Sequence, residues 1–346
     1  MSFIPKRKLN VLQTFIDLTA TTIPHGYEEI FAPLLQTYGA VRDSVGNWYI
    51  NNRKSSTPVS TMFTCHLDTV SVGGTPLVFG TRRDRLHKIA HRSDGRFIST
   101  DGTTNLGADD KAGMCVMLSM LQQDVEGLYY FFIGEECGGI GSSRIADTMP
   151  QLFTGIQRCI SFDRRGYNSI ITNQFGGECA SDKFADALSG QFARNKMFLD
   201  ADTTGVFTDS ANFTHLIPEC TNISVGYFHE HTTRECQDML FLETLCDVAP
   251  KIRWDDLPVS HSTEPEYAYY NDAHLFSGGT TSIQDMEDWL WAQYGTMPEA
   301  EWEALAMEIE ERKYMEDERT ERISIDRFMT DKELDEQITN HLNDIW

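Results

Sequence analysis

Residues 128–139 of this chain, LYYFFIGEECGG, indicate a buried strand that runs directly into two glutamates and a pair of glycines. The run from Leu128 to Ile133 is apolar or aromatic throughout, as is typical of a strand covered on both faces. Three further β-rich runs also stop at or just before a polar side chain: residues 60–65 before His66, residues 158–162 before Asp163, and residues 221–227 before His229 and His231.

Stretches with helical composition separate these strands. Lys111–Gln123 is apolar along its whole length and predicts a buried helix, while residues 185–192 and 238–248 predict two others. Alternating buried strands and helices are typical of an α/β domain with a mainly parallel or mixed central sheet. Ligands in such folds lie beyond the carboxyl ends of the strands, which is where these polar side chains are expected.

Length and composition are those of a globular protein. With 346 residues, 40% of them apolar and 23% charged, the chain can bury one large core, or one core plus a modest appendage. No run reaches the roughly 20 apolar residues that a membrane span needs. Val11–Ala20 predicts an amphipathic helix rather than the apolar core of a signal peptide. We therefore expect a cytoplasmic protein without a membrane partner, and its eight scattered cysteines are expected to be reduced.

The net charge of −23 is distributed unevenly along the chain. Phosphate binding needs clustered Lys and Arg, so this charge argues against a nucleic-acid partner. About 18 of the excess negative charges lie after residue 254, in a stretch of mainly helical composition. We therefore predict two parts: a domain over residues 1–254 that carries the motifs described next, and an acidic, mainly helical C-terminal extension over residues 255–346.

Five short motifs carry the chemistry, in one order along the chain: His66-Leu67-Asp68, residues 107–113 (GADDKAG), Glu135-Glu136, Asp163, and residues 229–232 (HEHT). Imidazole and carboxylate groups are common ligands of zinc. Two zinc ions about 3.5–4 Å apart can activate one water and polarise one carbonyl. One carboxylate must bridge the ions, and another must stay off them to take the proton of the water and deliver it to the leaving amine.

This order of motifs resembles the clan of co-catalytic zinc exopeptidases, which includes peptidase T with its carboxypeptidase and deacylase relatives, the bacterial zinc leucine aminopeptidases and the glutamyl aminopeptidases. The resemblance covers roughly residues 10–250 and implies a three-layer α/β/α zinc-exopeptidase domain with a central mixed sheet. Many relatives insert a lid domain between their Asp and His motifs. Only about 67 residues separate Asp163 from His231, so a full lid domain does not fit here.

The resemblance also implies five metal ligands. His66 and Asp163 match the terminal ligands of one ion, and Glu136 and His231 match those of the other. Asp109 matches the carboxylate that bridges the two ions. The implied cofactor is a pair of divalent metal ions, for which zinc is expected and cobalt and manganese are the alternatives.

Two further residues match groups that act beside the metals. Glu135 matches the general base. Asp68 matches the carboxylate that accepts the second N–H of His66 and raises the basicity of its ring. The peptide bond after the bridging acid is often cis in the clan, so a cis bond is expected between Asp109 and Asp110.

Some of these assignments have close competitors. Asp110 competes with Asp109 for the bridge, and His229 competes with His231 for the last ligand position. The clan pattern favours His231, because a Ser or Thr follows the ligand directly and Thr232 stands there. The two aspartates could also cap the helix that begins beside them, with or without a role at the metals.

The other site residues have ordinary structural interpretations as well. Asp163 could pair with Arg164 or Arg165 beside it, and Glu135 and Glu136 could be a solvated pair of surface acids. His66 could be a hydrogen-bonded histidine at the end of a strand. Five motifs in one order favour the metal centre over these interpretations.

The sequence therefore predicts a di-zinc hydrolase that cleaves an amide bond next to a free terminus, with an aminopeptidase acting on peptides as the first hypothesis. An N-acyl amino acid deacylase would use the same metal site, and the sequence has no motif for the specificity pocket that separates the two. A non-catalytic binding protein is the third hypothesis. Loss of a ligand or of Glu135 would mark that case, and none is missing. A homo-oligomer remains among the alternatives for the assembly state.

Overall fold

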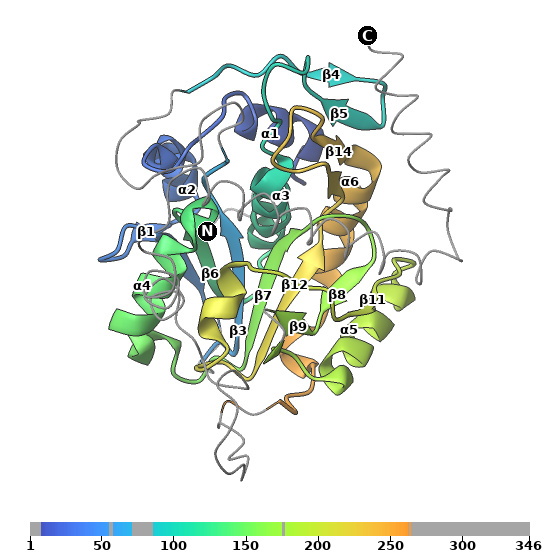
Figure 1. Cartoon of the computed structure of the whole chain (residues 1–346). Helices are drawn as coiled ribbons and strands as arrows, with labels where there is room; N and C mark the ends of the chain where they lie inside the picture. Colours follow the sequence, from blue (N-terminus) through green and yellow to red (C-terminus); the bar gives the residue numbers. More distant parts are fainter. Residues whose placement is uncertain (1–7, 55–57, 71–85, 175–176, 262, 264–346) are drawn as a thin grey trace, which may run out of the picture. The chain divides into compact units, whose positions relative to one another are not determined.

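A computed structural model describes residues 8–54, 58–70, 86–174, 177–261 and 263 (Figure 1). The predicted acidic extension lies outside the described residues from position 264 onwards. Within the described residues, the main sheet has eight strands in the spatial order β1-β2-β6-β3-β7-β12-β8-β11. Their bounds are β1 Val41–Arg42, β2 Trp48–Asn52, β3 Thr61–His66, β6 Gly127–Phe132, β7 Arg158–Arg164, β8 Ser169–Ile171, β11 Asp200–Asp202 and β12 Glu219–Ser224.

The sheet is mixed, as the sequence predicts. β3 runs parallel to both β6 and β7, and β7 runs parallel to β12, so four adjacent central strands share one direction. The strands on either side of these four run in the opposite direction, because β2 pairs antiparallel with β6 and β8 pairs antiparallel with β12. The carboxyl ends of the four central strands therefore lie at one edge of the sheet.

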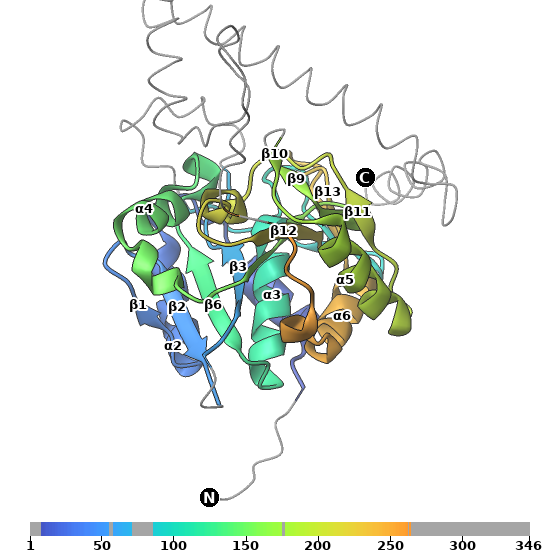
Figure 2. The same ribbon diagram turned by 90° about the horizontal axis from the view of Figure 1, so that it is seen from below.

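Helices cover both faces of this sheet, which confirms the three-layer arrangement (Figure 2). Alternate side chains of β6 enter two separate clusters of buried residues. Tyr129 and Phe131 belong to the cluster that includes α1, α3, α5 and α6, whereas Tyr130 and Phe132 belong to the cluster that includes α4. The helices are α1 Val11–Leu18, α2 Ala32–Thr37, α3 Ala108–Gln122, α4 Ile140–Thr148, α5 Asp182–Arg194 and α6 Met239–Val248.

Side-chain caps explain where several helices begin. Asn10, Ser181 and Asp238 precede α1, α5 and α6, and each accepts N–H groups from the first turn of its helix. Short 3₁₀ helices complete the backbone: η1 Glu28–Phe31, η2 Glu135–Cys137, η3 Pro150–Phe153, η4 Asp209–Phe213, η5 Ala249–Lys251 and η6 Trp254–Asp256. No helix in the described part of the chain combines the length and the apolar character of a membrane span.

The strand predicted over residues 221–227 is divided in the structure. β12 ends at Ser224, and Gly226 adopts a φ of 88°, which turns the chain out of the main sheet. The next residues form β13 in a second sheet of order β13-β14-β5-β4, with bounds β4 Arg92–Ser93, β5 Phe97–Ser99, β13 Tyr227–Phe228 and β14 Cys236–Asp238. A further two-stranded sheet pairs β9 Asn173–Gln174 with β10 Gly177–Glu178. Strands of two or three residues have no periodic pattern, which is why the sequence did not predict them.

The chain beyond α6 stays in contact with the amino ends of the central strands. Arg158, at the start of β7, donates a hydrogen bond from Nε to the carbonyl of Leu257 at 3.0 Å. Glu219, at the start of β12, accepts the N–H groups of Ser260 and His261 at 2.7 and 3.0 Å. These contacts bind the described residues after position 254 to the domain, while the predicted boundary at that position stays a prediction.

Phe63 offers a test of the central packing. Its ring on β3 is fully buried and stacks or makes edge contacts with Tyr129, Phe162 and Trp254. We expect Phe63→Ala to lower the free energy of unfolding by about 3–5 kcal/mol, because the cavity cannot close between rigid strands. Denaturant titration measures this loss. Phe198→Ala, at a ring that is 53% exposed, is the matched control, and equal losses in the two variants would contradict the assignment of Phe63 to the core.

Candidate metal centre

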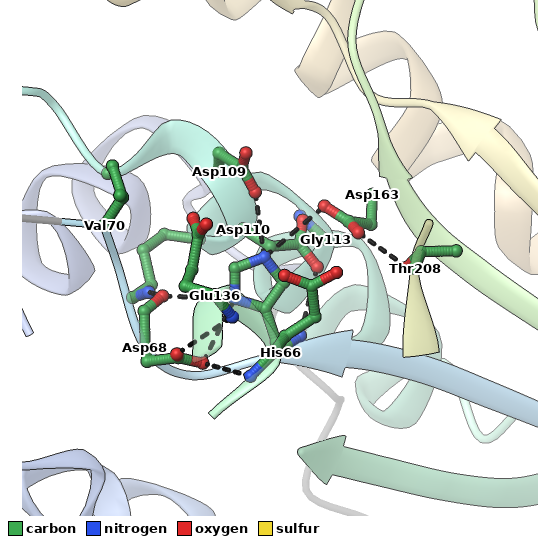
Figure 3. A network of polar contacts seen from close by, with 12 residues as sticks. His66, Asp68, Val70, Asp109, Asp110, Gly113, Glu136, Asp163 and Thr208 are labelled. Carbon is green, nitrogen blue, oxygen red and sulfur yellow. Dashed lines mark hydrogen bonds and ion pairs between the residues drawn. The ribbon is translucent and has the colours of Figure 1, made fainter. Parts of the chain in front are cut away.

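Two of the predicted ligands come from neighbouring parallel strands. His66 is the last residue of β3, and Asp163 is the second-last residue of β7. Because β3 and β7 pair in parallel, both side chains emerge at the same edge of the sheet. Nε2 of His66 lies 3.5 Å from Oδ1 of Asp163, although the two residues are almost a hundred positions apart (Figure 3).

Asp109 lies between two histidines. Its Oδ1 is 2.8 Å from Nε2 of His66, and its Oδ2 is 3.2 Å from Nε2 of His231. The two oxygens of one buried carboxylate therefore face two different imidazoles. The peptide bond from Asp109 to Asp110 is cis, which confirms the expectation drawn from the resemblance.

Glu136 completes the second half of the cluster. Its Oε2 lies 3.1 Å from Nε2 of His231, while its Oε1 is buried without a hydrogen-bond partner among the described residues. Among the described residues, four groups of three side chains have ligand atoms within 4.8 Å of one another and could each hold a metal ion. Two of these groups share Asp109: one consists of His66, Asp109 and Asp163, and the other of Asp109, Glu136 and His231. All five predicted ligands are brought together, and Asp109 belongs to both groups.

Asp110 and His229, the competitors of Asp109 and His231, are placed differently from them. Asp110 turns its carboxylate toward the backbone, where Oδ2 accepts the N–H of His66 at 3.2 Å and Oδ1 accepts that of Gly113 at 3.0 Å. His229 belongs to none of the candidate groups in the described structure. This geometry favours Asp109 and His231 as ligands. Asp110, rather than Asp109, makes the helix-capping contact that the sequence allowed for either aspartate.

Gly113 shows why the GADDKAG run ends in glycine. A Cβ at this position would lie 2.1 Å from the carbonyl oxygen of Phe162 and 2.5 Å from Oδ1 of Asp110. No side chain fits in this space, so α3 can approach β7 closely only with glycine here. That approach brings Asp109 near Asp163.

Asp68 links His66 to the turn that carries the two glutamates. Its carbonyl oxygen lies 3.1 Å from Nδ1 of His66, and its carboxylate lies farther from the same nitrogen, at 3.5 Å. The carboxylate accepts the N–H groups of Glu135 and Glu136 at 3.1 and 3.2 Å. The second N–H of His66 is thus nearest to the backbone of Asp68, and the Asp68 side chain orients the glutamate turn.

Glu135 lies beside the cluster. One of its carboxylate oxygens forms a group with atoms of His66 and Glu136, again within 4.8 Å. Burial raises the pKa of Glu135 well above its ordinary value, and the negative charges of Asp163 and Glu136 add to the rise, which the charge of His66 opposes. Such a carboxylate readily takes up a proton.

The electrostatics of the cluster fit a bound cation. Burial raises the pKa of Asp163 to about 6, and repulsion from Asp109 contributes to that rise. Four carboxylates, those of Asp109, Glu135, Glu136 and Asp163, share this site with two imidazoles. Burying so many like charges is unfavourable unless a positive charge compensates them. The unpartnered oxygen of Glu136 and the mixture of nitrogen and oxygen donors suit zinc or a similar divalent metal.

Residues outside the five motifs hold these candidate ligands in place. Glu235 is buried and accepts three backbone N–H groups, from Leu106 at 2.7 Å, Gly107 at 2.8 Å and Asp109 at 3.0 Å. Burial raises the pKa of Glu235 to about 7, and the charge of Asp109 adds to the rise. A single glutamate four residues after His231 has no pattern of its own, and its partners are backbone groups that leave no trace in the sequence.

Asp163 is held in a similar way. Its Oδ2 accepts a hydrogen bond from the hydroxyl of Thr208 at 2.6 Å, and its carbonyl oxygen accepts one from the hydroxyl of Tyr227 at 3.0 Å. The neighbouring arginines pair elsewhere, since Arg164 lies 3.6 Å from Asp202 and Arg165 lies 3.3 Å from Glu230. The two arginines thus face Asp202 and Glu230 rather than Asp163.

Comparison with known proteins gives the same fold. No family model and no curated protein matches the sequence. Solved structures with a similar fold include aminopeptidase PepT from Bacillus cereus ATCC 10987, with 15% identity and a TM-score of 0.55 over 69% of this chain and 96% of that one. A tripeptidase from Staphylococcus aureus shares 16% identity with a TM-score of 0.55, over 73% of this chain and 99% of that one.

The TET1 peptidase of Pyrococcus horikoshii, which can assemble into a tetrahedron or a large octahedral shell, is similar to the same degree. It shares 15% identity with a TM-score of 0.54, over 70% of this chain and 98% of that one. At these identities the likeness establishes the fold. The chain has the fold of these peptidases, which confirms the fold implied by the order of its motifs.

Glu235 provides a test of how the ligands are held. We expect Glu235→Ala to weaken metal binding about 10- to 100-fold, because the loop that carries Asp109 loses the acceptor of three N–H groups. Competition with a fluorescent chelator measures the affinity. Glu243→Ala, at an exposed position on α6, is the control. Wild-type affinity in the Glu235 variant would refute this role.

Proposed function

We propose that this protein is a metal-dependent exopeptidase, and that it acts as an aminopeptidase with two divalent metal ions. One observation carries the proposal: the two oxygens of Asp109 face His66 and His231, and each histidine also lies close to a carboxylate of its own, Asp163 or Glu136. A carboxylate shared between two such groups is the arrangement that a two-metal centre needs.

The first ion would be held by His66, Asp109 and Asp163, and the second by Asp109, Glu136 and His231. Two divalent cations in these positions supply the positive charge that lowers the pKa of a water molecule and polarises the carbonyl of an amide. We expect zinc, with cobalt and manganese as alternatives. The same charge would relieve the repulsion among the buried carboxylates.

Glu135 would transfer the proton. Of the four carboxylates in the cluster, it is the one that lies outside both of the groups that share Asp109, although it forms a group of its own with His66 and Glu136. It would take a proton from the attacking water and deliver it to the nitrogen of the leaving amine. Burial raises the pKa of Glu135 above its ordinary value, which makes the carboxylate a better proton acceptor.

The choice of an aminopeptidase draws support from the peptidases that share the fold. A deacylase of N-acyl amino acids is the second candidate, because it would need the same metals and the same base. Self-assembly is also part of the proposal, since TET1 peptidase forms closed shells. We place the protein in the cytoplasm on the basis of its sequence.

A substrate panel tests the activity. We expect the protein, loaded with zinc, cobalt or manganese, to release the chromophore from aminoacyl anilides and to leave N-acetylated aminoacyl anilides intact, because an aminopeptidase needs a free amine. Hydrolysis of N-acyl amino acids alone would shift the assignment to a deacylase. Treatment with a chelator should stop turnover, and added metal should restore it. A metal-loaded protein that hydrolyses neither class would contradict the proposal.

The role of Glu135 can be tested separately from metal binding. We expect Glu135→Gln to lower kcat by at least about 100-fold, since the amide cannot accept the proton. The metal content, measured by elemental analysis, should stay at the wild-type level. Glu178→Gln, on the exposed strand β10, serves as the matched control. Substantial residual turnover in the Glu135 variant would rule it out as the base.

A further inference from the structure

A second cluster of polar side chains borders the turn that carries the two glutamates. It consists of His25 and Glu28, from the segment after α1, and Asp68; one potential ligand atom of each lies within 4.8 Å of the others. Nδ1 of His25 is 2.6 Å from Oε1 of Glu28, and the second oxygen of Glu28 accepts the N–H of Gly26 at 2.6 Å. Neither His25 nor Glu28 is among the proposed ligands, and neither is the proposed base.

Thr69 attaches this segment to the metal centre. It donates its N–H to the carbonyl of Ile23 at 2.8 Å, and its hydroxyl accepts the N–H of Ile23 at 2.8 Å. Thr69 directly follows Asp68, so the two bonds place His25 next to Asp68. The position of the His25–Glu28 pair is therefore determined by the same segment that presents His66.

The ring of His25 also packs on the glutamate turn itself. Gly134 adopts a φ of 64° directly before Glu135, and a Cβ there would lie 2.9 Å from Nδ1 and 3.0 Å from Cε1 of His25. The ring thus fills the space that a side chain at position 134 would need. Asp68 accepts the next two N–H groups of the turn, those of Glu135 and Glu136.

Asn47 holds the outer ends of the same turn. Its Oδ1 accepts the N–H of Ile133 at 3.3 Å, and its Nδ2 donates to the carbonyl of Gly141 at 3.0 Å. Asn47 thus holds the residues on both sides of the glutamates. At the centre of the turn, Asp68 accepts the N–H groups of the two glutamates and the ring of His25 packs on Gly134, while backbone N–H groups that follow the glutamates bond to the carbonyls of Gly134 and Glu135.

We propose that His25 and Glu28 are positioning residues, which act through Gly134 and Asp68 to hold Glu135 in the orientation that the reaction needs. The kinetic part of this inference rests on the proposed function, whereas the restraint on the turn is a property of the folded protein. A third cation site at His25, Glu28 and Asp68 has less support, because both oxygens of each carboxylate already accept hydrogen bonds or face a ring nitrogen.

Hydrogen–deuterium exchange tests the restraint without reference to activity. In His25→Ala, we expect the amides of Glu135 and Glu136 to exchange about tenfold faster, because the turn loses the ring that packs on Gly134. His25→Phe keeps bulk beside Gly134 but cannot bind Glu28, and Glu28→Gln keeps the shape of the pair without its charge. In both variants, we expect the Glu135 and Glu136 amides to exchange at rates between those of His25→Ala and the wild type.

Kinetics test the consequence for catalysis. We expect His25→Ala to lower kcat about tenfold, with KM and bound metal close to the wild-type values, because a misplaced base slows the chemistry without changing the ligands. His215→Ala, at an exposed histidine, is the matched control. A general loss of fold would instead change KM, metal content and thermal stability together.

Two results would overturn the inference. One is unchanged exchange of the Glu135 and Glu136 amides in His25→Ala, and the other is loss of bound metal from that variant, which would identify a cation site instead. A wild-type protein that hydrolyses no substrate would defeat the proposed function. The exchange experiment would still decide the role of His25 in that case.

Discussion

The carboxylate of Asp109 has to face two imidazoles at once, and much of the surrounding structure serves that requirement. Glu235 fixes the backbone of Asp109 and of the loop before it. Asp110 accepts the backbone N–H of His66 and so connects the start of α3 to β3, which keeps Asp109 and His66 at a fixed separation. Gly113 lets α3 approach β7 and Asp163. Gly107, Asp110 and Gly113 of the GADDKAG run thus all bear on the position of the Asp109 side chain.

Charge is the second constraint on the centre. Carboxylates buried beside one another repel, and that repulsion contributes to the raised pKa of Asp163. Lys111 supplies one internal cation, but it is fully buried and its Nζ donates to the carbonyl of Asp68 rather than to the ligand oxygens. Binding of divalent metal would compensate the remaining charge, so metal affinity and folding stability should be coupled in this protein.

Rigid neighbours hold the candidate ligands from outside the cluster. β3 and β7 are buried central strands that present His66 and Asp163, and hydrogen bonds from Thr208 and Tyr227 fix Asp163 further. The glutamate turn, by contrast, is a 3₁₀ segment that depends on outside contacts. It contacts Asp68, Asn47 and His25, so residues far apart in the chain contribute to the position of Glu135, the proposed base.

The sequence by itself determined the α/β class and most of the long elements, because buried strands and helices leave periodic patterns. The order of its motifs implied the mixed sheet and five candidate ligands through resemblance to the zinc exopeptidases. Only the tertiary structure shows how these side chains are placed. It brings the five candidates together, and its geometry favours Asp109 over Asp110 and His231 over His229, since neighbours in sequence differ in the direction of their side chains. Glu235, His25 and the β13 sheet also emerged only in three dimensions. Glu235 binds backbone N–H groups, His25 packs on a glycine, and β13 pairs with another short strand. Contacts of these kinds depend on distances between segments, which a sequence pattern does not record.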